Sequence, residues 1–169
     1  DQPYVVKTKD GAWLCLMTTG RGKEGEGGQH IVATRSLDRG KTWSPLIDIE
    51  PASGPEASWV VPLIVPSGRV YAFYTYNAKN MREVKADKGP IKRVDTLGEY
   101  TFKFSDDNGL TWSKERYFVP VREMDIDRRN PYGGKVRFFW GVGRPAAVNG
   151  AAYLPVAKVG RFGEGFMAE

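Results

Sequence analysis

The sequence contains a single cysteine, Cys15, and a single histidine, His30. One cysteine excludes a disulfide within the chain, and so few thiol and imidazole groups exclude the usual zinc sites. No apolar run approaches the ~18 residues that a membrane-spanning helix needs. The glycine-rich stretch 20–28 is not followed by a helix-forming sequence, which argues against a phosphate-binding loop. We therefore expect no metal, no other cofactor and no membrane span.

Positive charge is in modest excess, because 25 Lys and Arg residues stand against 20 Asp and Glu residues, for a net charge of +5. The basic residues are scattered over the chain rather than gathered in one run. Such a surface suits carboxylated or sulfated sugars. We therefore expect a glycan or an acidic sugar as the partner, and not nucleic acid.

Glycine and proline divide the chain into short segments. The 20 Gly and 11 Pro residues separate short runs of aromatic and β-branched residues. This punctuation is typical of short strands joined by turns. It predicts an all-β fold.

The pattern S-x-D-x-G-x-T-W-S occurs twice, beginning at Ser36 and at Ser105, an offset of 69 residues. A repeat of this period is typical of propellers and repeat arrays. The recurring residues that we expect to be structural are Ser36, Asp38, Gly40, Trp43, Ser105, Asp107, Gly109 and Trp112.

The chemistry of the repeated segment is that of a tight turn between two strands. Its Asp can accept hydrogen bonds from nearby backbone N–H groups, and its Gly supplies a positive φ. Its Trp can fold back, bury its ring and bond its N–H locally. We interpret Asp38 and Asp107 as structural rather than catalytic carboxylates.

Each repeat lies between the third and the fourth of four predicted strands. The first unit has strands at 4–8, 13–17, 30–35 and 46–49, and the second at 59–65, 70–76, 100–104 and 116–119. A third unit starts at Arg144, turns at Asn149-Gly150 and continues to Val156. We therefore predict one incomplete β-propeller domain, 1–169, of four-stranded antiparallel blades: blade 1–50, blade 51–120 and a partial blade 121–169. Since the chain starts at Asp1 rather than Met, we expect it to be a segment of a longer protein.

The two S-x-D-x-G-x-T-W segments resemble the Asp box, or BNR repeat, of the sialidase (neuraminidase) superfamily. At the level of blade order the resemblance covers the whole chain. It implies a six-bladed propeller, of which this chain holds about two and a half blades, and most often an enzyme that removes sialic acid from glycans. Asp boxes also occur in other hydrolases, polysaccharide lyases and non-catalytic propellers, so they indicate the fold more strongly than the activity. We expect an extracellular or periplasmic location.

Blade order also predicts the position of a site. The short turns at 9–11, 66–68 and 148–150 share one face with the two boxes. The long links 19–29, 50–58, 77–99 and 120–143 share the opposite face. Function concentrates on long loops held by a rigid scaffold, so we expect the site on this second face, near the central axis.

The candidate catalytic residues on this face are His30, Glu56, Asp127 and Arg144. His30 opens a strand at the mouth of the glycine-rich loop and can act as a base or an acid near neutral pH. Glu56 and Asp127 are candidate acid/base carboxylates. Candidate substrate-binding residues are Trp59, Asn77, Arg82, Arg128, Tyr132 and Trp140.

Further roles follow from the resemblance. Sialidases hold the substrate carboxylate with three arginines, whose planar guanidinium groups match carboxylate oxygens in pairs. The resemblance implies Arg144 as one of them and Arg82 or Arg128 as a second. It also implies a tyrosine nucleophile paired with a glutamate, which we expect outside this chain.

Three hypotheses remain open from the sequence. The first is a sialidase-like glycoside hydrolase fragment that acts on an acidic or acylated glycan. The second is another carbohydrate-active propeller, a hydrolase or a polysaccharide lyase, in which His30 and Tyr132 abstract a proton and Arg144 neutralises a uronate. The third is a propeller without catalytic activity that binds a glycan or a protein.

Overall fold

The computed structural model describes residues 2–83, 89–90, 92, 94–130, 134, 139–141, 143–159 and 165–168. Regular structure in this part of the chain is almost entirely antiparallel β-sheet. Helix is limited there to one α-turn, α1 (Asp125–Arg128), and one 3-10 turn, η1 (Val94–Thr96). The predicted all-β class is confirmed.

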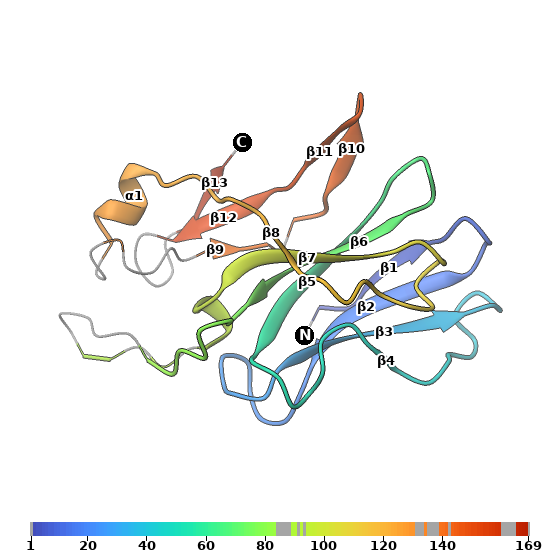
Figure 1. Ribbon diagram of the computed structural model, residues 1–169, viewed down its shortest axis with the longest axis horizontal. Helices are drawn as coiled ribbons and strands as arrows, with labels where there is room; N and C mark the ends of the chain where they lie inside the picture. Colours follow the sequence, from blue (N-terminus) through green and yellow to red (C-terminus); the bar gives the residue numbers. More distant parts are fainter. Residues whose placement is uncertain are drawn as a thin grey trace.

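Two four-stranded sheets follow one another along the chain (Figure 1). The first sheet holds β1 (Tyr4–Lys7), β2 (Trp13–Thr19), β3 (His30–Ser36) and β4 (Ile47–Asp48). The second sheet holds β5 (Ala57–Ile64), β6 (Val70–Tyr76), β7 (Glu99–Ser105) and β8 (Tyr117–Phe118). In each sheet the strands lie in sequence order, as predicted from the repeat.

The third unit is smaller and less regular. β10 (Ala146–Val148) and β11 (Ala151–Tyr153) form the hairpin predicted at Asn149-Gly150. A separate three-stranded sheet holds β9 (Phe139–Trp140), β12 (Val156–Val159) and β13 (Gly165–Ala168), in the order β13-β12-β9. The sequence predicted one strand continuing to Val156, whereas the structure ends β11 before Pro155. Proline has no N–H group to give to a strand ladder, which accounts for the break.

The first and second sheets bury an apolar interface between them. β5 packs against β1, β2 and β3. Leu14, Leu16, Ile31 and Ala33 of the first sheet meet a second set of buried residues that includes Tyr74. Leu14 and Leu16 share a sheet face because side chains alternate along a strand. Each such leucine contributes about 1.5–3 kcal/mol by its burial.

A second apolar cluster joins the second sheet to the third unit. Val61, Leu63, Phe73 and Tyr100 are buried with Val156 of β12. The rings of Phe73 and Tyr100 stack with their centroids 6.1 Å apart. The three units are therefore connected through two successive cores, and the second sheet lies between them.

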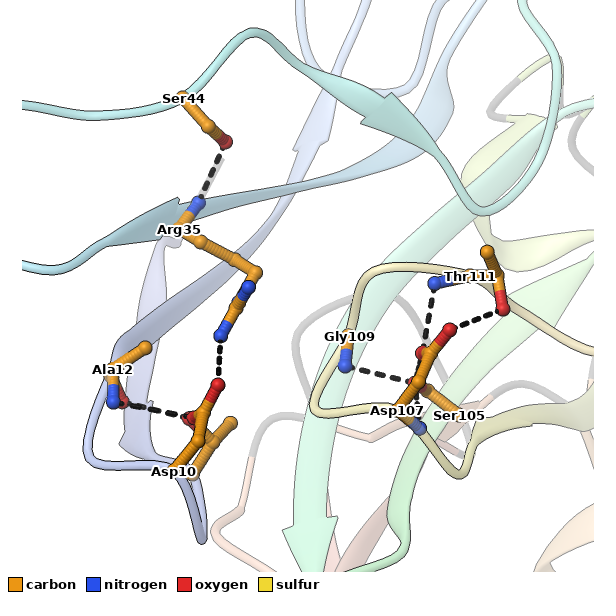
Figure 2. A network of polar contacts seen from close by, with 9 residues as sticks. Asp10, Ala12, Arg35, Ser44, Ser105, Asp107, Gly109 and Thr111 are labelled. Carbon is orange, nitrogen blue, oxygen red and sulfur yellow. Dashed lines mark hydrogen bonds and ion pairs between the residues drawn. The ribbon is translucent and has the colours of Figure 1, made fainter.

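The two repeated segments, hereafter the boxes, share four hydrogen bonds. In the second box Ser105 Oγ donates to Asp107 Oδ1 at 2.7 Å, and Gly109 N–H donates back to Ser105 Oγ at 2.8 Å (Figure 2). Asp107 also accepts from Thr111, at 2.8 Å from its N–H and 2.6 Å from its hydroxyl. The first box repeats these contacts from Ser36 to Thr42.

Positive φ angles occur at two consecutive positions of each box. Gly40 and Gly109 both have φ of 86°, and the preceding residues, Arg39 and Asn108, both have φ of 62°. Glycine removes the steric cost at one position only, so the box needs its side-chain hydrogen bonds to hold the other. The structure supports the interpretation of both aspartates as turn-forming groups.

The tryptophans of the two boxes differ in burial. Trp112 packs against the first core, whereas Trp43 remains 41% exposed, so the prediction of a buried ring is wrong for Trp43. The two tryptophans differ because the second box lies against the first sheet, where its Gly109 is close to Leu14. The predicted local bond is also missing at Trp112, whose Nε1 is buried and meets no acceptor.

Candidate functional site

The long links and the boxes lie at opposite ends of the sheets. Thr19 pairs with His30, Ala57 with Tyr76, and Tyr76 with Glu99, so the links 20–29, 49–56 and 77–98 leave at one end. We call this the loop end. The short turns and both boxes lie at the other, the box end (Figure 1). This arrangement agrees with the prediction from blade order.

A buried carboxylate holds an arginine at the loop end. Glu56, whose side chain is 6% exposed, precedes β5, and Arg82 follows β6. Arg82 Nη1 and Nη2 donate to the two carboxylate oxygens of Glu56, at 2.7 and 2.6 Å. This two-point pairing fixes the plane of the guanidinium, while half of the Arg82 side chain stays exposed.

Neighbouring polar groups complete this cluster. Gly28 N–H donates to Glu56 Oε1 at 3.1 Å, and Asn77, which is buried, places its Nδ2 at 3.4 Å from Oε2. Asn77 also closes the turn after β6 by accepting from Met81 N–H at 2.9 Å. Two of the predicted binding residues, Asn77 and Arg82, therefore meet the predicted acid/base residue Glu56 in one cluster.

The glycine-rich loop 20–28 lies directly against this pair. A Cβ added at Gly27 would lie 3.2 Å from Glu56 Oε1 and 3.3 Å from Arg82 Nη1. Glycine at position 27 therefore lets the backbone approach the ion pair closely. The sequence predicted this loop at the mouth of the site but not its contact with Glu56 and Arg82.

Electrostatics keep the Glu56 carboxyl ionised. Burial alone would raise the pKa of Glu56, but hydrogen bonds from Arg82 and from Gly28 outweigh it, and the pKa is lowered. The same pairing raises the pKa of Arg82. A carboxylate held ionised is suited to orienting a cation, and a proton donor near neutral pH needs the opposite shift. Acid/base action by Glu56 stays a prediction.

Two further candidates lie beside the cluster. Trp59 has a φ of 63°, which is strained for a bulky residue, and it lies in a register shift between Ser58 and Val61. Its backbone N–H donates to Thr18 Oγ1 at 3.0 Å. His30 begins β3, and its Nδ1 is buried without a hydrogen-bond partner. The structure brings both residues to the loop end, and their roles stay predictions.

Asp127 and Arg128 lie on α1 and have different surroundings. Asp127 and Lys158 form an ion pair of 2.7 Å in which both side chains are 1% exposed. The N–H of Met124 donates to the same carboxylate oxygen at 2.8 Å. Arg128 is exposed and pairs with Glu123 and Asp125. Because Asp127 is closed off from solvent, a catalytic role would require α1 to move.

The remaining candidates lie in the third unit. Arg144 is exposed and precedes β10. Trp140 is part of β9 and pairs with Ala157 through the backbone. Tyr132 lies outside the described residues.

A buried charge network at the seam of the two sheets was not predicted. Glu50, 1% exposed, accepts two hydrogen bonds of 2.6 Å from Arg116 and one of 2.5 Å from the hydroxyl of Tyr74. Lys103 Nζ donates to the carbonyl of Ile49 at 2.8 Å and lies 3.5 Å from Glu50. Burial lowers the pKa of Lys103 and raises that of Tyr74.

The sequence pattern gives no signal for this network. In β7, Lys103 lies on the face opposite to the aromatic residues, together with Thr101 and Ser105, so the period of two alone would place it toward solvent. A buried lysine needs a carboxylate partner, but the sequence alone does not identify Glu50, which is 53 positions away along the chain. The network connects the link after β4 to β6, β7 and the segment before β8.

The described residues contain no group of three or more His, Cys, Asp or Glu side chains that could hold a metal ion. Within the same residues, no helix is long and apolar enough to cross a membrane. Among the described residues, the loop end offers a fixed guanidinium, an imidazole and amide groups.

Comparisons with known proteins support the fold. No family model matches the chain, and no curated protein matches it. Among solved structures, the Hadza microbial sialidase Hz136 matches 92% of this chain at 18% identity, with a TM-score of 0.59. A protein of unknown function from Dyadobacter fermentans DSM 18053 matches 98% at 16% identity, with a TM-score of 0.63.

These similarities concern the fold alone. The chain spans 32% of the sialidase and 48% of the Dyadobacter protein. At such low identities the comparison shows a shared fold and not a shared activity. The chain has an all-β fold similar to that of a microbial sialidase.

Proposed function

We propose that this chain is part of a sialidase-like propeller, a glycoside hydrolase that acts on an acidic or acylated glycan. The observation that carries the proposal is the Glu56–Arg82 pair: an arginine held by a buried carboxylate at the loop end, with half of its side chain open to solvent. The two boxes at the opposite end and the fold shared with a sialidase support the same reading. In this proposal the two sheets are blades, and further blades complete the ring.

Arg82 keeps a hydrogen-bond donor that a substrate can use. Its donors already reach both Glu56 oxygens, the carbonyl of Asn80 and Asn80 Oδ1. Since a guanidinium has five N–H bonds, one N–H on Nη1 remains for a substrate oxygen. Arg82 can thus hold one oxygen of a sugar carboxylate, and we assign the second oxygen to another arginine, with Arg144 as the first candidate.

Three other loop-end residues, Trp59, Asn77 and His30, also have roles in this proposal. Trp59 provides a ring on which a sugar can stack, and Asn77 keeps the turn before Arg82 in place. His30 is the candidate proton-transfer group because it begins β3 at the loop end and an imidazole is the commonest general acid or base. We place the enzyme outside the cytoplasm, in an extracellular or periplasmic location.

The test is a panel of fluorogenic glycosides offered to the intact protein. The sialoside and the uronide carry a carboxylate, and the neutral galactoside does not. The proposal expects turnover of the sialoside or the uronide but not of the galactoside. Equal turnover of all three substrates, or none by folded protein, would contradict it.

A polysaccharide lyase is the second candidate, and the position of His30 as the first residue of β3, at the loop end, is the observation that favours it. A lyase forms an unsaturated uronate that absorbs in the ultraviolet, whereas a hydrolase does not. Ultraviolet absorbance that appears with a polyuronate and is lost in His30→Ala would support this candidate. Binding to glycans without any product would instead indicate a propeller without catalytic activity.

A further inference from the structure

The guanidinium of Arg82 has two edges that can each make a two-point contact. Glu56 takes the edge formed by Nη1 and Nη2, with bonds of 2.7 and 2.6 Å. The other edge, formed by Nε and Nη2, carries two further N–H bonds, and a planar guanidinium fork of this kind matches the two oxygens of a carboxylate. With Glu56 in place, this second edge is the one left for a two-point contact with a substrate carboxylate.

Asn80 occupies the second edge. Arg82 Nε donates to the backbone carbonyl of Asn80 at 3.4 Å, and Arg82 Nη2 donates to Asn80 Oδ1. Two oxygens of one residue therefore lie where the two oxygens of a carboxylate would otherwise bind. Asn80 is exposed, as is half of the Arg82 side chain, so a ligand that arrives from solvent competes with Asn80 for these donors.

The position of Asn80 is set by its own turn. Its φ of 49° lies in the left-handed region, which Asn tolerates better than most residues. Its N–H donates to the carbonyl of Asn77 at 2.8 Å, and the N–H of Met81 donates to Asn77 Oδ1 at 2.9 Å. The turn holds Asn80 and the ion pair with Glu56 holds Arg82, so separate parts of the loop end bring the two residues together.

We propose that Asn80 is a specificity-determining residue of the loop end, because it occupies the Nε/Nη2 edge of Arg82 and so limits this arginine to one oxygen of a substrate carboxylate. The inference rests on the proposed function for the kind of substrate. The contact between Asn80 and Arg82 is a property of the loop end itself and can be tested without turnover.

The competition has a consequence of definite sign. The apparent affinity for a ligand falls with the fraction of molecules whose binding groups are open. Loss of the Asn80 side chain frees Nη2 and leaves only the long contact of Nε with the carbonyl, so a carboxylate should bind more tightly. If Asn80 instead served only to support Arg82, the same change would weaken binding.

The first test measures KM and kcat of the intact protein for a fluorogenic sialoside. Asn80→Gly removes the amide and suits the positive φ, while Asn80→Asp keeps an oxygen at Arg82 and adds a negative charge. Asn108→Gly is the matched control, since Asn108 has a φ of 62° in the second box, at the box end. Inhibition by N-acetylneuraminic acid and by its methyl ester separates the contribution of the carboxylate from that of the sugar.

The proposal expects Asn80→Gly to lower KM about threefold or more and to leave kcat unchanged. The same variant should tighten inhibition by the acid and not by the ester. Asn80→Asp should raise KM, and Asn108→Gly should leave every value unchanged. An unchanged or higher KM in Asn80→Gly, with normal unfolding, would overturn the proposal, because it would assign Asn80 a supporting role only.

The second test does not depend on enzymatic activity. It follows the side-chain Nε–H resonance of Arg82 by NMR while sodium acetate replaces sodium chloride at constant ionic strength. The half-maximal shift should occur at a lower acetate concentration in Asn80→Gly than in wild type, and Asn108→Gly should match wild type. Equal acetate responses in wild type and Asn80→Gly would overturn this inference even in a protein that hydrolyses the sialoside. The expected response in a protein without turnover would support the inference and contradict the proposed function alone.

Discussion

The buried network around Glu50 allows a quantitative prediction of stability. Tyr74 is 0% exposed and its hydroxyl donates to Glu50 Oε1 at 2.5 Å. Tyr74→Phe removes only this oxygen and keeps the ring in the core. A hydrogen bond to a charged acceptor contributes about 1.5–3 kcal/mol. Glu50 Oε1 keeps its hydrogen bond from Arg116 Nε. We therefore expect Tyr74→Phe to lower the free energy of unfolding by an amount near the lower end of this range, about 1.5–2 kcal/mol.

Removing the main cation of the network should cost more. Arg116→Met takes away both 2.6 Å bonds and leaves Glu50 buried with only Tyr74 and Lys103 nearby. Breaking a buried pair costs about 3–5 kcal/mol, and we expect a loss near the lower end because Lys103 Nζ stays 3.5 Å from Glu50 and Arg116 is partly exposed. The expected order of unfolding free energies is therefore wild type above Tyr74→Phe above Arg116→Met.

Urea unfolding of the three proteins measures this order, provided that the slope with denaturant stays constant. Tyr117→Phe, on the exposed strand β8, is the matched control and should stay within ~0.5 kcal/mol of wild type. A Tyr74→Phe loss below ~0.5 kcal/mol, or one larger than that of Arg116→Met, would refute the assignment of Glu50 as a buried charge shared by both groups.

Three other predictions concern different parts of the chain. Gly27→Ala should push the glycine-rich loop off the Glu56–Arg82 pair, and a rise in hydrogen exchange of the loop amides without a change in the core would show it. Hydrogen bonds from Thr42 lower the pKa of Asp38 to about 2. The stability that ionised Asp38 contributes to the fold is therefore complete above the unfolded pKa of ~3.9 and is lost as pH falls toward 2. Acid titration of Asp38→Asn should therefore show a smaller loss of stability between these pH values than wild type, and an identical profile would contradict the pKa. Leu16→Ala, in the core between the sheets, should cost about 2–5 kcal/mol in thermal or urea unfolding, and a smaller loss would mean that the sheets do not pack as described.

Local patterns in the sequence were sufficient to predict the sheets. Two boxes of nine residues located the turn between the third and fourth strands, and the strand order followed from it. The physical reason is that a turn with its own side-chain hydrogen bonds depends little on the rest of the fold. The all-β class and the placement of loops and boxes at opposite ends were predicted for this reason.

Burial and pairing were harder to predict. The sequence could not show that Trp43 stays exposed while Trp112 packs on the first core, since the boxes are locally the same and only the neighbouring sheet differs. The partners of Glu50 and Asp127 were also missed, because each lies far along the chain and depends on how the sheets pack.

At the candidate site the sequence selected the right region but not the arrangement. Asn77, Arg82 and Glu56 were each predicted at loop ends, and the structure joins them in one cluster. It gives Glu56 a lowered pKa, which the sequence could not indicate because the shift depends on the contact with Arg82.

The most direct measurement is kcat/KM for a fluorogenic sialoside with the intact protein and two matched variants. Arg82→Lys keeps a positive charge for Glu56 but removes the planar donors, and Arg69→Lys does the same at the box end, where Arg69 pairs with Asp106. The account predicts that Arg82→Lys lowers kcat/KM about tenfold or more, mainly through KM, while Arg69→Lys leaves it unchanged. Equal values for wild type and Arg82→Lys, with normal unfolding, would contradict an anion-binding role for the loop end.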